Sequence, residues 1–122
     1  MLVMETRSLL KDKEVSMTQS LYLGGETHCV QFYYYSDTTG TLEISYTEAN
    51  STVKNILWVV SNRITLGWAK TQFTLPALDS IHLTYKMIGG SFDGTYRPFL
   101  ALDDLNITRG QCPTFECGAG LV

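Results

Sequence analysis

Apolar and polar residues alternate along most of this chain with a period of two, the pattern of strands that turn one face toward a core. Segments 30–35 and 42–47 alternate in this way on either side of the turn residues 38–40, and together they predict a β-hairpin. In segment 56–60 the odd-numbered and the even-numbered residues are all apolar, which predicts a strand covered on both faces. Turn residues interrupt the pattern at short intervals, so it indicates a chain built of strands.

Further strands are expected on both sides of this region. Residues 8–12 read as a turn or loop, and the glycine-rich segment 89–94 reads as a link. The other segments that fit strands are 69–75, 81–86 and 99–107, and segments 2–4 and 16–23 are further candidates. Six or seven short strands of this kind favour an all-β fold, a sandwich of two antiparallel sheets.

The composition is that of a single globular domain. The chain has 122 residues, of which 44% are hydrophobic and 17% charged, enough for one core. We expect the domain to span residues 1–113, with residues 114–122 as a tail or the start of a linker, because small residues are frequent there. The net charge of −3 and the nine scattered Lys and Arg residues argue against nucleic acid as a partner.

Neither a membrane span nor a signal peptide is predicted in this chain. Its longest apolar run, residues 56–60, has the length of a strand and is far short of the roughly 20 residues of a transmembrane helix. Glu5 and Arg7 interrupt the apolar start before a signal-peptide core can form. A chain that starts at Met1 in this way is expected to stay in the cytosol.

Two N-glycosylation sequons point instead to the secretory route. Asn50 begins the first sequon and lies in a polar, turn-like stretch, whereas Asn106 begins the second and lies on the outward parity of the final strand. Both side chains are therefore expected to reach solvent and to carry glycans. The alternative is chance occurrence, since such triplets are common in any sequence.

Three cysteines bear on the same question of compartment. An odd number in a small chain is typical of one disulfide and one leftover thiol, whereas three reduced thiols would indicate the cytosol. Cys29 opens one predicted strand, Cys112 follows another, and Cys117 lies in the tail. A disulfide that closes a long loop would contribute about 4 kcal/mol to stability.

No constellation of residues indicates catalysis. His28 and His82 lack the spacing of a zinc site, and three cysteines without a Cys-x-x-Cys pair do not make one. No Gly-x-Ser-x-Gly elbow is present to hold a nucleophile. The sequence therefore favours a protein that is not an enzyme.

The acidic pair Asp103-Asp104 is the main candidate for a polar site. Adjacent strand residues point to opposite faces, so the two carboxylates cannot converge as a catalytic dyad. Parity puts Asp103 on the core face with Leu105 and Ile107. A buried carboxylate needs hydrogen bonds, a charged partner or a metal. We expect Asp103 to bond to backbone groups or to Arg97, or to bind a cation together with Asp104.

Three consecutive tyrosines, Tyr33, Tyr34 and Tyr35, allow two interpretations. Aromatic faces suit sugar rings, so the cluster could form a carbohydrate platform. The other interpretation is that Tyr34 packs in the core while its two neighbours pack at an edge.

Several fragments of the chain, in order and at consistent spacing, resemble those of the MAM domain, a module named for meprin, a neuropilin-type antigen and a receptor tyrosine phosphatase. They are a cysteine that enters an aromatic strand, a Gly-Thr-Leu strand, a tryptophan strand, a Gly-Trp pair, and an acidic strand closed by Gly-x-Cys, found at Cys29–Tyr35, Gly40–Leu42, Leu57-Trp58, Gly67-Trp68, Ala101–Leu105 and Gly110–Cys112. The resemblance covers about residues 1–113.

The resemblance implies a jelly-roll-like sandwich and a disulfide between Cys29 and Cys112, which would leave Cys117 unpaired. It also implies a role in extracellular adhesion or ligand recognition within a larger membrane or secreted protein. Some members hold a calcium or sodium ion near the strand that matches Asp103 and Asp104, and such a structural ion is the one cofactor expected here.

The family's N-terminal segment, which carries two further cysteines that pair with each other, has no match in this chain. We therefore expect a partial MAM domain, an incomplete sandwich whose exposed sheet edge favours pairing with another chain. The predicted function is a non-catalytic, extracellular or cell-surface module that makes homophilic or heterophilic protein contacts. The alternatives are an accessory domain of a host protease, a carbohydrate-binding sandwich that depends on Tyr33 or Tyr35, and a truncated product without independent function.

Overall fold

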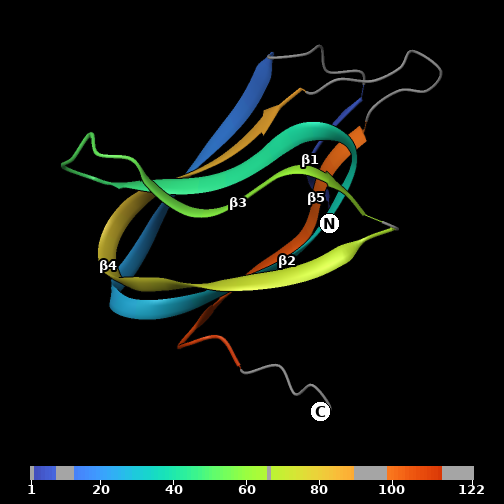
Figure 1. Ribbon diagram of the computed structural model, residues 1–122. Coiled ribbons are helices and arrows are strands. Elements are labelled where there is room, and N and C mark those ends of the chain that lie inside the picture. The colour runs from blue at the N-terminus through green and yellow to red at the C-terminus, as the bar shows by residue number, and fades with distance from the viewer. Residues whose placement is uncertain (1, 8–12, 66, 90–98, 114–122) are drawn as a thin grey trace.

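The computed structural model describes residues 2–7, 13–65, 67–89 and 99–113 (Figure 1). The strands are β1 (Leu2–Arg7), β2 (Glu14–Glu48), β3 (Asn55–Ile64), β4 (Ala69–Ile88) and β5 (Phe99–Arg109). Every pairing between them is antiparallel. These described residues form no helix, and so none that is long and apolar enough to cross a membrane. The fold is all-β, as the alternation predicts.

Two long strands, β2 and β4, bend so that each contributes to both layers of a β-sandwich (Figure 1). In the first layer, residues 28–36 of β2 pair with β5 on one side and with residues 69–75 of β4 on the other, and β1 pairs with β5. In the second layer, residues 80–88 of β4 pair with residues 14–22 and with residues 41–48 of β2. The last of these segments also pairs with β3. The jelly-roll-like sandwich that the sequence predicts is confirmed.

The hairpin predicted between segments 30–35 and 42–47 is wrong. Both segments belong to β2, and they pair with the two halves of β4 instead of with each other. Between them β2 passes from the first layer to the second, where its register against β4 shifts between Tyr34 and Thr41. The physical reason is that each segment has its own apolar face, and the two faces cover each other only when the segments lie in opposite layers.

Two consecutive glycines allow the other bend of β2. Gly24 and Gly25 have φ angles of 64° and 74°, in the left-handed region that side chains disfavour. The pairing of β2 with β4 shifts register between Tyr22 and Glu26, on either side of these glycines. At this bend the chain leaves the second layer and enters the first.

The core lies between the layers and takes side chains from both. Aromatic rings join the two layers, since Trp58 of β3 packs edge-on against Phe32 and Tyr34 of β2, with ring centroids 4.9 and 5.0 Å away. The fully buried side chains alternate along the strands and include Val30, Phe32, Leu42, Ile44, Leu75, Ile81, Leu83, Tyr85, Met87, Leu100 and Leu102. Burial of this apolar surface is the main favourable term in folding.

Strand β3 has one face in solvent, so the prediction that residues 56–60 are covered on both faces is wrong. Ile56 and Val59 are 58% and 50% exposed. Among the described strands, β3 pairs with β2 alone and therefore lies at an edge of its layer. Each layer of the sandwich covers only the inner face of the other, so the outer face of β3 meets solvent although its sequence is apolar throughout.

A β-bulge explains how β3 divides its apolar residues between core and solvent. Ile44 pairs with Trp58 while Ser45 pairs with Ile56, which leaves Leu57 as an extra residue. Leu57 and Trp58 consequently both pack against the core, although they are neighbours in sequence. One apolar run thus supplies a part of the core and an exposed strip.

Tyr85 brings a hydroxyl group into the core. Its side chain is fully buried, and its hydroxyl donates a hydrogen bond to Gln19 Oε1 at 2.9 Å. Burial raises the pKa of Tyr85 from 10.0 to about 12, because the core disfavours the phenolate. The folded chain therefore keeps this tyrosine neutral at a pH where the unfolded chain ionises it.

We expect the stability of the domain to fall between pH 10 and pH 12 for this reason. The contribution of Tyr85 is fully present below pH 10 and is lost as the pH rises through about 12, with a total of about 3 kcal/mol. Urea denaturation at neutral and alkaline pH measures the loss. Between these two pH values Tyr85→Phe should lose less stability than the wild type. Tyr22→Phe, which removes an exposed phenol, should lose as much as the wild type. Equal losses in the wild type and Tyr85→Phe would contradict this assignment.

Candidate functional site

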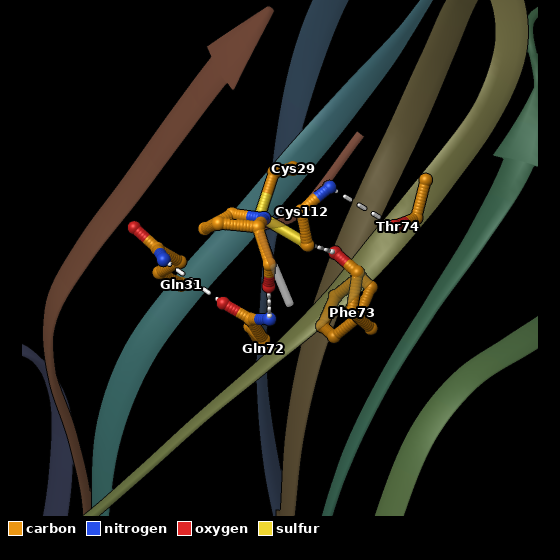
Figure 2. The surroundings of a disulfide bond; sticks show 7 residues. Cys29, Gln31, Gln72, Phe73, Thr74 and Cys112 are labelled. Atoms are coloured by element: carbon orange, nitrogen blue, oxygen red, sulfur yellow. Dashed lines mark hydrogen bonds between the residues drawn. A yellow bond between two sulfur atoms is a disulfide. The ribbon is translucent and has the colours of Figure 1, made fainter. Parts of the chain in front are cut away.

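A disulfide joins the start of the central segment of β2 to the chain just beyond β5 (Figure 2). Cys29 and Cys112 are bonded across a sequence separation of 83 residues, with their Cα atoms 4.7 Å apart. Cys29 is buried at a point where β2 pairs with both β4 and β5. The disulfide that the family resemblance implies is therefore present in the structure. Cys117 lies outside the described residues.

Hydrogen bonds hold the same segment against β4 (Figure 2). The N–H of Cys112 donates to Thr74 Oγ1 at 3.4 Å, and Gln72 Nε2 donates to the carbonyl of Pro113 at 2.6 Å. Gln72 Oε1 in turn accepts a hydrogen bond from Gln31 Nε2 at 2.9 Å. The chain beyond β5 is thereby tied to the side of the first layer that faces away from the core, which we call the outer face.

The acidic pair forms a β-bulge in β5. Asn106 pairs with Gln31 and Asp103 pairs with Tyr33, so that β5 uses one residue more than β2 over the same length. Asp104 has a φ angle of 57°, a left-handed conformation that aspartate tolerates better than most residues. Its N–H donates to Asp103 Oδ1 at 2.7 Å. The two aspartates thus have a structural role in shaping the strand.

The bulge overturns the parity argument that put Asp103 on the core face. Before the bulge the core residues of β5 are Leu100 and Leu102, whereas after it they are Leu105 and Ile107. Asp103 itself lies on the outer face and is half-buried. An extra residue reverses the alternation, so one parity cannot describe the whole strand.

A hollow of about 360 Å³ lies beside this bulge on the outer face, and we call it the bulge hollow. It is formed between strands β2, β4 and β5, where the extra residue interrupts the regular pairing. The Lys70 ammonium lies 5.9 Å from the centre of the Tyr33 ring, a cation–π arrangement. The residues that line the hollow are Gln31, Phe32, Tyr33, Lys70, Asp104, Leu105 and Asn106.

An aromatic pair also lies on the outer face. Tyr35 is two residues beyond Tyr33 in β2, and its ring packs against Trp68 with the centroids 5.8 Å apart. Trp68 is exposed, Tyr33 and Tyr35 are half-buried, and Tyr34 is buried in the core. The three tyrosines are therefore divided between the two faces of β2.

The other candidate surface is an apolar strip along β3, which we call the β3 strip. Its members are Ile56 and Val59 of β3 and Val53, which precedes the strand and is 63% exposed. A strip of this kind on an edge strand is a typical contact surface for another chain.

A charged cluster adjoins the β3 strip. Glu43 is paired with Val59 in the ladder and is nearly buried. Lys54 Nζ lies 2.6 Å and Lys86 Nζ 3.9 Å from Glu43 Oε2. The hydrogen bond with Glu43 raises the pKa of Lys54, because it favours the charged ammonium. The lysines neutralise a carboxylate that would otherwise destabilise this part of the sheet.

A comparison with protein-family models identifies the family of this disulfide-bonded β-sandwich. Residues 1–113 match the family model described as MAM domain, meprin/A5/mu. The chain belongs to the MAM domain family. MAM domains are extracellular adhesion-type modules and are non-catalytic.

Solved structures similar to this MAM domain include carbohydrate-binding modules. TmCBM61 in complex with β-1,4-galactotriose has a TM-score of 0.56 and 14% identity, over 82% of this chain and 67% of that one. A CBM4 structure has a TM-score of 0.53 and 17% identity, over 78% of this chain and 61% of that one. This chain therefore spans roughly two thirds of the length of these structures. At such identities the likeness shows a shared β-sandwich fold alone.

Both sequon asparagines of the MAM domain are exposed, as the sequence predicts. Asn50 follows β2 and lines a hollow of about 510 Å³ together with Glu48 and Asp79. Asn106 lines the bulge hollow on β5. Each side chain is accessible to solvent, whereas glycosylation itself stays a prediction.

A metal ion at the acidic pair also stays a prediction. Within residues 2–7, 13–65, 67–89 and 99–113 there is no group of three or more His, Cys, Asp or Glu side chains that could hold a metal. Calcium takes six to eight oxygen ligands, so the described side chains around Asp103 and Asp104 do not complete a site. Arg97, the other expected partner of Asp103, lies outside the described residues.

Sequence reasoning did not single out Gln31, Lys70 or Glu43. Gln31 and Lys70 come from different strands and meet at the bulge hollow only through the pairing of β2 with β4. Gln31 shares its face of β2 with Tyr33, and Lys70 lies on the face of β4 opposite to Phe73, which marks both as outer-face residues. The register between the two strands cannot be inferred from this pattern. The charged cluster around Glu43 could not be predicted for the same reason, because its two lysines lie on two other segments.

Proposed function

We propose that this MAM domain is an extracellular recognition module that contacts another protein through the β3 strip. The observation that carries the proposal is the exposure of Ile56 and Val59, two large apolar side chains on an edge strand. Adjoining exposed apolar residues on a sheet edge are a liability for a domain that works alone. A protein partner would remove them from water.

The chemistry around the strip favours a protein partner over a small molecule. The strip has an apolar centre, and the cluster of Glu43 with Lys54 and Lys86 provides charged groups beside it. An apolar centre with a polar rim is typical of protein interfaces. The backbone edge of β3 that faces away from β2 is suited to receive a strand from a partner.

The first partner to test is a second copy of the chain. Sedimentation equilibrium would compare the wild type with the double variant Ile56→Lys/Val59→Lys. We expect the wild type to associate and the double variant to stay monomeric, because two ammonium groups would have to lose their hydration in the contact. Tyr22→Lys is the matched control, since Tyr22 is 79% exposed and lies in the segment of β2 that pairs with β4 away from β3.

Two outcomes of this measurement would count against the proposal. A wild type that stays monomeric at every concentration would exclude self-recognition through the strip. Equal association of all three proteins would place the contact elsewhere on the domain.

We further propose that the domain works outside the cell or at its surface and carries glycans on Asn50 and Asn106. The Cys29–Cys112 disulfide supports this location, because such bonds persist in oxidising compartments. The exposure of both asparagines supports the modification. The test is the mass of the chain secreted from eukaryotic cells, before and after enzymatic deglycosylation. An unchanged mass would exclude both glycans.

Carbohydrate binding is a second candidate function, and the outer face of the first layer favours it. This face presents the rings of Tyr33, Tyr35 and Trp68 together with the amides of Gln31 and Asn106. Carbohydrate-binding modules share the sandwich fold, and one of them was solved with β-1,4-galactotriose. A glycan array that includes this trisaccharide tests the candidate. The absence of binding to any glycan, also by a Thr108→Ala chain that lacks the second sequon, would remove it.

A further inference from the structure

The bulge hollow brings together aromatic, amide and charged groups from three strands. Strand β2 supplies the Tyr33 ring and the Gln31 amide, β4 supplies the Lys70 ammonium, and β5 supplies the Asn106 amide. The volume of about 360 Å³ lies within the range of small-ligand sites. Side-chain amides both donate and accept hydrogen bonds, which suits a ligand that does the same.

We propose that a saccharide binds in the bulge hollow, with one sugar ring on Tyr33 and its hydroxyl groups hydrogen-bonded to Lys70 and Asn106. This inference rests on the second candidate function and assigns it a site. A sugar ring has an apolar C–H face that packs on an aromatic ring, and hydroxyl groups that donate and accept. The lining residues include one cation, Lys70, and one anion, Asp104, so their formal charges sum to zero, which suits a neutral ligand.

Part of this lining is held in place before any ligand arrives. Gln31 donates to Gln72, and Gln72 donates to Pro113 in the segment fixed by the disulfide. A site whose groups are already ordered loses less conformational entropy on binding.

Lys70 is the group that must move. Its side chain is exposed, and its ammonium lies 5.9 Å from the centre of the Tyr33 ring. A cation–π contact at an exposed site is weak, so a sugar ring can displace the ammonium from the aromatic face. The displaced ammonium then donates hydrogen bonds to the hydroxyl oxygens of the ligand.

The saccharide has two sources with the same chemistry. One is a glycan carried by Asn106 itself, which lines the hollow, and the other is an oligosaccharide of a partner. Thr108→Ala separates these sources, because it removes the sequon and leaves the Asn106 amide in place. Thr108 is exposed on β5 and does not line the hollow.

The experiment is glycan-array binding by the full chain secreted from eukaryotic cells. We expect the Thr108→Ala chain to bind one or more neutral oligosaccharides. Tyr33→Ala in the same background should weaken this binding roughly tenfold or more, because the stacking surface is lost. Tyr22→Ala is the matched control, since Tyr22 is exposed and lies in the second layer, where it pairs with Ser80. This variant should leave binding unchanged.

The wild type distinguishes the two sources. Binding by the wild type equal to that by Thr108→Ala assigns the site to a partner's oligosaccharide, whereas binding that appears only after removal of the sequon assigns it to the chain's own glycan. Binding that Tyr33→Ala leaves unchanged would overturn the assignment to the hollow and keep carbohydrate binding as a function. No binding by Thr108→Ala to any oligosaccharide would overturn both. Circular dichroism confirms that each variant is folded.

Discussion

Replacement of both Cys29 and Cys112 by alanine is expected to destabilise the domain by about 4 kcal/mol. The bond joins residues 83 positions apart, so its removal returns a large conformational entropy to the unfolded chain. For a chain of 122 residues this corresponds to a melting temperature lower by roughly 15 °C. Differential scanning calorimetry under non-reducing conditions measures the difference.

Cys117→Ser is the matched control for the disulfide. The family resemblance predicts that Cys117 is unpaired, so this variant should melt as the wild type does. A non-reducing peptide map should contain the Cys29–Cys112 link in both proteins. Equal melting temperatures of the wild type and the double alanine variant would contradict the stabilising role of the bond, and scrambled links would contradict the pairing itself.

Phe32→Ala is expected to destabilise the domain by about 3 to 5 kcal/mol. The ring is 1% exposed and lies between the layers, with centroids 4.9 Å from Trp58 and 6.0 Å from Phe73. Its removal leaves a cavity that hydrogen-bonded strands on both sides cannot collapse to fill. Urea denaturation measures the change as a lower midpoint at an unchanged slope.

Tyr33→Ala is the control for this second prediction, because it truncates the next residue along the same strand. Tyr33 lies on the outer face and is half-buried, with Lys70 over its ring. Tyr33→Ala should therefore lower the free energy of unfolding by about 1 kcal/mol, well below the effect of Phe32→Ala. Equal losses would mean that the two faces of β2 are wrongly assigned.

Alternation of apolar and polar residues correctly predicted which side chains face the core wherever a strand is regular. Ile81, Leu83 and Tyr85 are buried in β4, and Tyr34 is buried while its two neighbours lie outward. The reason is that side chains of a regular strand point to opposite faces in turn, whatever the strand pairs with.

The same alternation fails to predict the faces where a strand contains an extra residue. The bulge at Asp103 and Asp104 moves the core positions of β5 from one parity to the other, and the bulge at Leu57 turns two neighbours inward. Both candidate surfaces depend on these bulges. The bulge hollow opens beside the first, and the second leaves Ile56 in solvent on β3.

The sequence by itself determined the class of the fold, the exposure of both sequon asparagines, the faces of the regular strands and, through its family resemblance, the disulfide. These properties follow from local periodicity and from motifs that can be read one segment at a time. Only the tertiary structure decided which segments pair, that β2 and β4 each cross between layers, and which residues meet at the β3 strip and the bulge hollow. The physical reason is that register and layer assignment depend on how distant apolar faces cover one another, and this is a property of the whole sandwich.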